Sequence, residues 1–330
     1  MKKLLIPLLV TIGLLTACEK QIVIDIEDME PRLVVDALGT TGAPLSVGIT
    51  ESRPVFGTHT GEEGFPRIAD ATVTLTANGT VYNASLVDDR YILPYSPQGG
   101  DRLTLQIDMP GRPSVSAEAT VPAEPLVGEV SFPALDIDNP SNALSFFVTI
   151  TDRAASNDYY YITLTRFDTI YLTYYSIDSL PIQIDTIYDS ETTFECDDPL
   201  VVTDMNVIDM IGEMGMSTYY GQQLLFNDER LDGHTHTIEL NTYNPVARYY
   251  YGADYDNYTY EIHCTYILEV GSVSHDTYLY LKTRQAARDN DALLNLLSEP
   301  VQVHSNIEGG IGIFGVSNRK VFTHHTVYRP

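Results

Sequence analysis

The chain has 330 residues, with 45 Asp and Glu against 19 Lys and Arg, and a formal net charge of −26 at pH 7. A surface this acidic repels nucleic-acid phosphates and anionic lipid head groups, so the composition excludes nucleic acid as a partner. The hydrophobic content of 44% and the scattering of the acids in ones and twos argue against a disordered acidic chain. We expect two domains from this length.

Residues 1–17 are predicted to be a secretory signal peptide. Two lysines precede an apolar run at 4–17, which is shorter than the roughly 20 residues that a membrane-spanning helix needs. A leucine, two small residues and Cys18 then match the lipobox of bacterial lipoproteins, in which the cysteine thiol carries the lipid and the chain is cut just before it. We predict lipid attachment at Cys18. The alternative is a buried cysteine in an N-terminal core helix.

Residues 18–30 are predicted to be a short acidic tether. Cleavage before Cys18 removes two lysines and no acid, so the net charge changes from −26 to −28. The tether reaches at most about 40 Å when it is extended, which keeps the folded body near the membrane.

Residues 31–122 are predicted to form a β-sandwich of the immunoglobulin or transthyretin type. Short runs with period-two alternation, such as RLVVDAL and ATVTLTA, follow one another between turn signals. Asn78-Gly79 lies between two of these runs and predicts a tight β-hairpin. The Gly- and Pro-rich loop at 52–69 is long enough to be either disordered or functional.

A second β-rich domain is predicted at 144–330, after a proline-containing linker at 123–143. Residues 274–297 break its strand pattern, because their apolar side chains follow helical spacing and predict one or two helices. Ser274 or Asp276 is suited to cap the first of them. The predicted fold class is therefore mainly β, with one or two short helices.

Cys196 and Cys264 are the two cysteines that remain after Cys18. In an oxidising compartment an even pair is consistent with a disulfide that closes a long loop. The alternative is two buried free thiols, and the sequence leaves both open.

Two motifs resemble ligand sites and have simpler explanations. Gly310, Gly312 and Gly315 fit GxGxxG, but too few residues follow for the helix, strand and acid of a dinucleotide fold. We expect these glycines to let a strand approach neighbouring backbone closely. His234 and His236 would share one face of a strand, but no third metal ligand lies at a diagnostic spacing, so we expect exposed strand residues and no metal or cofactor.

A tyrosine- and aspartate-rich loop is predicted to bind a ligand or a partner. Tyrosine offers a large contact area at a low entropy cost, which explains its enrichment at interfaces. The alternatives are a polar turn between strands and core packing. The predicted binding residues are Tyr249, Tyr250, Tyr251, Asp254, Tyr255, Asp256 and Tyr258.

Three hydroxyl residues fit an Asp-Ser/Thr-aliphatic pattern of O-glycosylation in secreted proteins of the Bacteroidota. They are Thr169, Ser179 and Thr186. The pattern is loose, and only its clustering here makes it a prediction.

No catalytic signature is present: the chain lacks GxSxG, HExxH and a paired-carboxylate motif. A triad assembled from distant residues would not be visible in the sequence. We therefore expect a protein that is not an enzyme, with hydrolase as the remaining catalytic alternative.

Nearly the whole chain resembles an uncharacterised family of Bacteroidota outer-membrane lipoproteins, known as domain of unknown function 4249. The most specific segments are CEKQIVIDI, PRLVVDALGT, ADATVTL, YLYLKTRQ and SEPVQVHSNIEGGIGIFG. The resemblance implies an N-terminal immunoglobulin- or transthyretin-like sandwich, a second β-rich domain and a gene beside a TonB-dependent receptor. It implies no catalytic residues.

We accordingly expect a lipid-anchored accessory protein of the outer membrane that faces the cell surface, with the periplasmic face left open. Its expected ligand is an oligosaccharide, a peptide or a chelate, and its expected partner is a TonB-dependent transporter. The alternative is a structural, adhesive or envelope-assembly protein.

Overall fold

The computed structural model describes residues 31–53, 65, 67–135, 139, 142–175, 181–202, 219–246, 258–293 and 301–329. These residues form a mainly β structure with one long helix, which confirms the predicted fold class. Within these ranges, no helix has both the length and the apolar character needed to cross a membrane.

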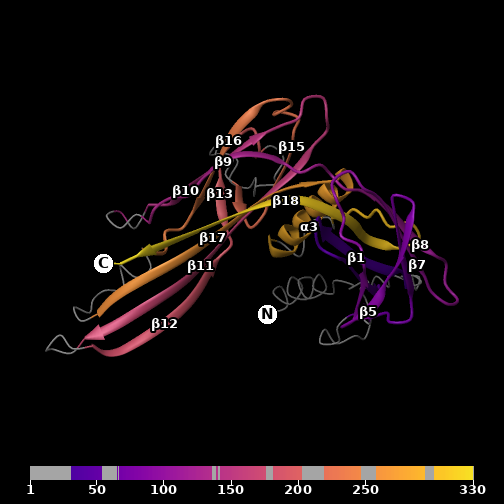
Figure 1. Ribbon diagram of the computed structural model, residues 1–330, viewed down its shortest axis with the longest axis horizontal. Helices are drawn as coiled ribbons and strands as arrows, with labels where there is room; N and C mark the ends of the chain where they lie inside the picture. The colour runs from indigo at the N-terminus through magenta and orange to yellow at the C-terminus, as the bar shows by residue number, and fades with distance from the viewer. Residues whose placement is uncertain are drawn as a thin grey trace, which may run out of the picture. The chain divides into compact units, whose positions relative to one another are not determined.

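The largest sheet has nine strands and joins segments from both ends of the chain (Figure 1). Its order is β12 (Pro181–Glu191), β11 (Tyr159–Tyr175), β17 (Tyr258–Val273), β18 (Ile311–Tyr328), β1 (Leu33–Thr40), β2 (Leu45–Glu51), β6 (Arg90–Leu93) and β5 (Ser85–Val87). The ninth strand, β15 (Leu224–Asn227), pairs with the first residues of β11.

Two smaller sheets complete the described strands. One has the order β14 (Tyr219–Gly221), β13 (Phe194–Cys196), β16 (Thr235–Thr242), β10 (Leu144–Thr151) and β9 (Leu126–Ser131). The other has the order β4 (Thr80–Asn83), β3 (Thr72–Ala77), β7 (Arg102–Asp108) and β8 (Val115–Thr120). Asn78 and Gly79 join β3 to β4 with φ values of 49° and 86°, which are those of the predicted tight hairpin turn.

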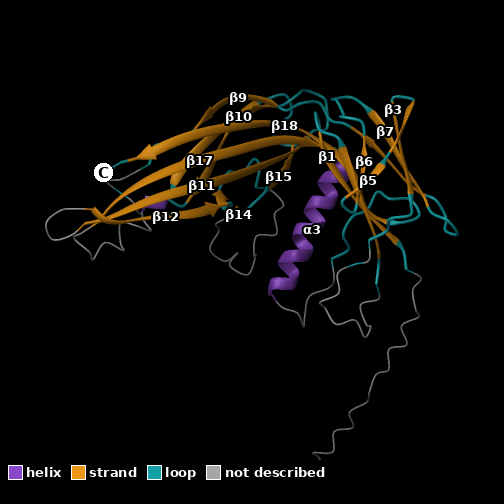
Figure 2. Ribbon diagram, turned by 60° about the horizontal axis from the view of Figure 1, so that its bottom comes forward, coloured by secondary structure: helices purple, strands orange, loops and turns teal. Residues whose placement is uncertain are grey.

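Helix α3 (His275–Leu293) is the long helix of Figure 2 and lies within the predicted segment 274–297. Ser274 caps it, because its hydroxyl accepts a hydrogen bond from the amide of Thr277 at 3.3 Å. Tyr278 on the helix packs with Tyr161 and Leu225, so a small hydrophobic cluster holds the helix against β11 and β15.

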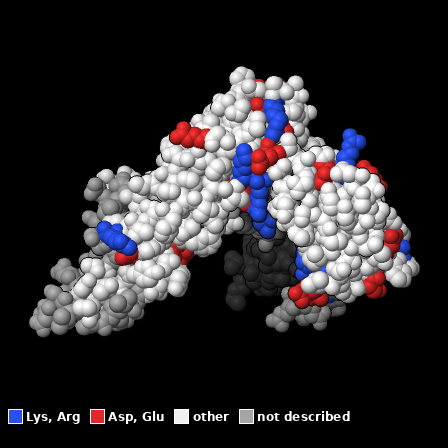
Figure 3. Space-filling model, in the orientation of Figure 1, with Lys and Arg blue, Asp and Glu red and all other residues white. Residues whose placement is uncertain are grey.

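Charged side chains are scattered in small groups on the face shown in Figure 3, with wide uncharged areas between them. This distribution agrees with a sequence in which the acids occur in ones and twos. The ion pairs on the surface join single side chains, as between Arg90 and Asp36 at 3.1 Å.

The first hydrophobic core forms between the four-stranded sheet and the strands around β1 and β2. Its members alternate along each strand, as period-two geometry requires, with Val35 and Ala37 on β1 and Val73 and Leu75 on β3. Phe314 of the last strand also belongs to this core.

A parallel pairing between β1 and β18 explains the glycine motif. Val35 lies opposite Gly312, whose φ is +117°. A Cβ at Gly312 would lie 2.0 Å from the main-chain oxygen of Val35, and one at Gly315 would lie 2.1 Å from the hydroxyl of Thr277. The prediction that these glycines permit close approach of a strand to its neighbours is confirmed.

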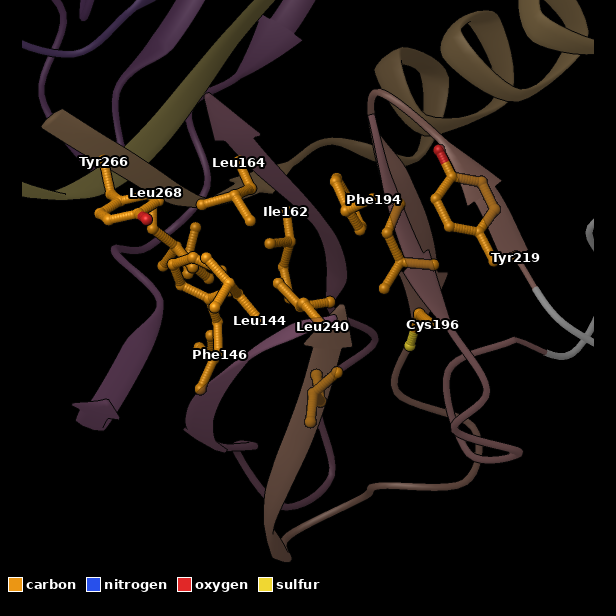
Figure 4. Close-up of a cluster of buried hydrophobic side chains, with 14 of the residues drawn as sticks. Leu144, Phe146, Ile162, Leu164, Phe194, Cys196, Tyr219, Leu240, Tyr266 and Leu268 are labelled. Atoms are coloured by element: carbon orange, nitrogen blue, oxygen red, sulfur yellow. The ribbon is translucent and has the colours of Figure 1, made fainter. Parts of the chain in front are cut away.

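The second core packs the strands β11 and β17 against β10, β13 and β16. Figure 4 shows Phe146, Leu164 and Tyr266 on one side of this cluster, with Cys196 and Tyr219 on the other. All of these side chains are buried, and the rings of Phe146 and Tyr266 make an edge contact with centroids 5.1 Å apart.

The division into a sandwich at 31–122 and a second domain at 144–330 stays a prediction. What the structure adds is the course of β18, which pairs with β1 through residues 311–317 and with β17 through residues 318–328. Segments that we assigned to different domains are thus joined by one continuous strand.

Candidate functional site

A cavity of about 240 Å³ lies between β11, β12 and the segment that follows β16. Its lining is Arg166, Asp168, Asp189, Ser190, Glu191, Tyr243 and Pro245. The register of β11 and β12 places Arg166 opposite Glu191 and Asp168 opposite Asp189. Because side chains two residues apart point to the same face of a sheet, these four charged groups gather on one face.

Arg166 is the buried cation of this site. Its Nε donates to Asp168 Oδ2 at 2.9 Å, and its Nη1 donates to the main-chain oxygen of Tyr243. Both side chains of the ion pair are almost completely buried, with exposed fractions of 4% and 2%. A buried charge needs a partner of this kind, since an unpaired one would cost several kcal/mol.

Asp168 is held in an unusual environment. Burial raises the pKa of Asp168 above its ordinary value, while the Arg166 guanidinium and the Cys264 thiol act in the opposite direction. Its Oδ1 atom is buried and accepts no hydrogen bond from the described residues. The pair is therefore less well satisfied than its short ion-pair distance suggests, which is a frequent property of functional sites.

Glu191 supplies a permanent negative charge. Burial would raise the pKa of Glu191, but the hydroxyl and amide of Thr193 and the amide of Thr192 donate hydrogen bonds to it and hold the pKa below its ordinary value. These donors all act on Oε1. The carboxylate is thus fixed in direction as well as in charge.

An adjoining cavity of about 310 Å³ shares Glu191 and Tyr243 with the first. Tyr220 and Tyr243 are 67% and 49% exposed and offer ring faces at its lining. The remaining lining groups are Asn142, Ala143, Thr193, Phe194, Glu195, Asn241, Thr242 and Asn244. Together the two cavities combine carboxylates and side-chain amides with exposed aromatic rings.

This arrangement is suited to binding. Three carboxylates against one guanidinium give the first cavity an excess of hydrogen-bond acceptors, so a bound molecule has to bring donors such as hydroxyl or ammonium groups. The tyrosine rings add apolar faces on which a flat or polyhydroxylated molecule can stack.

A second acidic cluster connects two turns through hydrogen bonds. Carboxylate oxygens of Asp152, Asp158 and Asp228 lie within 4.8 Å of one another. The chain itself supplies donors to them: Tyr160 and the amide of Gly233 bond Asp152, and the amide of Asp158 bonds Asp228. Burial raises the pKa of Asp228, and the neighbouring carboxylates add to the rise.

The predicted tyrosine loop lies almost wholly outside the described residues. Tyr249, Tyr250, Tyr251, Asp254, Tyr255 and Asp256 are among the residues that are not described. Tyr258 is the first residue of β17 and lies opposite Tyr174 of β11. Val246 is the last described residue before the loop. The loop is therefore close in sequence to Tyr243 and Pro245 of the cavity lining.

Of the two alternatives left open for Cys196 and Cys264, the structure has the second, since both are free buried thiols. The two cysteines belong to different sheets, Cys196 on β13 and Cys264 on β17, and each packs into the second core. Burial raises the pKa of Cys196 to about 11 and raises that of Cys264 as well, so both thiols are protonated at neutral pH.

The remaining predicted residues are dispersed. Cys18 and Ser179 lie outside the described residues. Thr169 is a partly buried residue of β11, and Thr186 is exposed on β12, so of these two only Thr186 is openly accessible. His236 is paired with Asp198, while His234 contacts the main-chain oxygen of Asp232.

The charged cavity was not predicted from the sequence, although one signal for it was present. In the run Tyr160-Ile162-Leu164 the inward positions of β11 are apolar, and the next two are Arg166 and Asp168. Two opposite charges that replace apolar residues on the buried face of a strand point to an internal ion pair. The register with β12, which brings in Glu191, has no comparable signal.

Comparison with known proteins gives one family. A search of curated proteins finds no match. The model of the domain of unknown function DUF4249 matches residues 19–323, which is nearly the full length. The chain therefore belongs to the DUF4249 family.

Proposed function

We propose that this protein is a lipid-anchored, non-catalytic binding protein of the outer membrane, and that it holds a small polar ligand in the cavity lined by Arg166, Asp168 and Glu191. The observation that carries the proposal is the gathering of these charges on one face by the register of β11 and β12. Stability alone does not favour such a cluster, because apolar residues at buried positions often stabilise as well or better.

The lining narrows the ligand class. An excess of carboxylates disfavours an anionic chelate and favours an oligosaccharide or a peptide that carries an amine. The exposed rings of Tyr220 and Tyr243 add stacking surface for either ligand.

Calorimetry with neutral oligosaccharides and lysine-containing tripeptides tests the binding site. We expect at least one probe to bind and Tyr243→Ala to weaken it at least tenfold, since this change keeps the main-chain oxygen that accepts from Arg166. Tyr188→Ala removes an exposed tyrosine outside the lining and is the matched control. Failure of every probe to bind, or an equal loss in both variants, would contradict the proposal.

The anchor is a separate part of the proposal. Cys18 follows a short apolar run and two small residues, which is the arrangement of a lipidation signal. We expect labelled palmitate to be incorporated into the wild-type chain and not into Cys18→Ser, and we expect this variant to leave the membrane fraction. Intact membrane association of Cys18→Ser would exclude the anchor.

We further propose that the protein faces the cell surface and serves a TonB-dependent transporter in nutrient uptake. A structural or adhesive role is the second candidate, favoured by the exposed aromatic side chains Phe167, Tyr171 and Tyr188 on one region of the large sheet. Affinity purification from detergent-solubilised cells separates them, because only the first role requires a transporter in the purified complex.

A further inference from the structure

The strand β12 forms an outer edge of the nine-stranded sheet. It has 11 residues, and among the described parts of the chain only β11 pairs with it (Figure 1). An edge strand of this kind presents a row of main-chain N–H and C=O groups on its open side, where a further strand can pair.

The other strands at the ends of the sheets are shorter. Among the described residues, 318–328 of β18 also pair on one side only, with β17, but this segment carries Arg319 and Lys320, and lysine is a common protection of an open edge. Strands β5 and β14 have three residues each, and β4 and β15 have four. The edges β8 and β9 have six residues each, and β8 is bridged at Ser116 by Glu308. Short edges are a common defence against unwanted strand pairing. The length of β12 departs from this pattern.

The strand β12 also lacks lysine, the side chain that most often protects an edge strand. Its sequence, PIQIDTIYDSE, contains no lysine or arginine, and its one proline is the first residue. The register with β11 is regular from Arg166 to Tyr174 and shifts only at Tyr175, near the hairpin end. Ile187 and Tyr188 are 39% and 79% exposed, and as adjacent residues they point to opposite faces. An added strand would thus meet an apolar side chain on each face.

The charge of β12 indicates which kind of strand can pair with its open side. Asp185, Asp189 and Glu191 are its only charged residues, and the whole chain carries −26. On the face shown in Figure 3, no Lys or Arg lies along this strand. A second copy paired through the same edge would bring like charges together, which is unfavourable, whereas a basic strand would gain attraction.

We propose that β12 is a docking edge, and that it accepts an extended, lysine- or arginine-rich segment of a partner protein as an additional strand. Main-chain hydrogen bonds would give affinity, and the acidic side chains would select basic partners. Asp189 and Glu191 also line the ligand cavity, but the proposal does not require that a ligand binds there, and it does not depend on the lipid anchor.

Three synthetic peptides test the docking edge with the full-length lipoprotein in detergent. The first alternates lysine and valine over nine residues, the second has glutamate in place of each lysine, and the third is the first with its central valine replaced by proline. Fluorescence anisotropy should show binding of the first peptide alone, weakening as salt is added. Hydrogen exchange should show new protection of the β12 amides when that peptide binds.

Lysines placed on the edge provide the matching change in the protein. Thr186→Lys together with Ser190→Lys, both exposed on β12, should weaken binding of the first peptide at least tenfold. Ser85→Lys with Val87→Lys adds the same charge at β5, on the opposite edge of the sheet, and should change binding less than twofold. Equal binding of the proline peptide, equal effects of the two double variants, or unchanged exchange of the β12 amides would overturn the proposal. Dimers joined through β12 would overturn it as well.

Discussion

At the scale of single residues, the Arg166–Asp168 pair is the least expected feature of the second core. It lies among side chains such as Ile170 and Tyr266, where removing either charge leaves the other without compensation. Breaking a buried pair in this way costs about 3–5 kcal/mol, while replacing both partners is often close to neutral.

We predict that Arg166→Met lowers the free energy of unfolding by about 3–5 kcal/mol at pH 8 and by less at pH 5. Burial gives Asp168 a higher pKa in the folded chain than in the unfolded chain. A carboxyl of this kind favours the folded state at low pH, and the contribution is lost as the pH rises through its folded pKa. Loss of Arg166 raises the pKa of Asp168 further, so the free energy of unfolding of the variant is lowered most at high pH. Urea unfolding at both pH values measures the difference.

The control for this prediction is Arg166→Met combined with Asp168→Asn. The second change removes the titrating carboxyl, so we expect the pH dependence caused by Arg166→Met to disappear and part of the stability to return. Equal destabilisation by Arg166→Met at pH 5 and pH 8 would mean that lost packing of the arginine stem, and not the unpaired charge of its buried partner Asp168, is the main cost.

The sequence predicts the strand position of these residues but not their cross-strand partners. It assigned Arg166 and Asp168 to a β-rich segment, and alternation alone puts both on the buried face. It gave no information on Glu191 or Tyr243, because contacts between separate strands depend on register and on the path of the chain. The tyrosine loop, which was predicted from composition, is adjacent in sequence to the cavity lining and stays a prediction.

At the scale of elements, local signals were sufficient for turns and for the helix. Asn78-Gly79 and Ser274 act through neighbouring residues, so the hairpin and the helix start followed from the sequence. The parallel pairing of β1 with β18 did not, because its partners are about 280 positions apart in the chain. The glycine motif was the feature of the sequence that indicated a close approach between strands.

We predict that Gly312→Ala destabilises the protein by at least about 2 kcal/mol, since it combines a left-handed backbone with a contact to the neighbouring strand. The new Cβ would lie 2.0 Å from Val35 O, which forces β1 and β18 apart. Gly128→Ala on β9 is the matched control, because a Cβ there meets its nearest atom at 3.6 Å. Thermal unfolding of both variants measures the effect, and a Gly312→Ala protein as stable as Gly128→Ala would show that the two strands separate without cost.

At the scale of the whole folded body, β18 connects the two hydrophobic cores. Phe314 and Val316 belong to the first core, and Phe322 on the same strand packs against the second. No turn or linker interrupts the strand between them. Loss of the first core should therefore remove a strand from the second, and the cores are expected to unfold together.

The two buried thiols report on this coupling, because both lie in the second core and are unreactive while they are buried and protonated. Phe314→Ala, a change confined to the first core, costs about 3–5 kcal/mol. In a Cys18→Ser background, where Cys196 and Cys264 are the remaining thiols, labelling should become faster by roughly 100-fold or more, since each 1.4 kcal/mol changes the open population tenfold. Val321→Ala, an exposed position on the same strand, should leave the rate nearly unchanged. If Phe314→Ala melts the first core while thiol labelling keeps its wild-type rate, the two cores are independent and β18 is a tether between separate folding units.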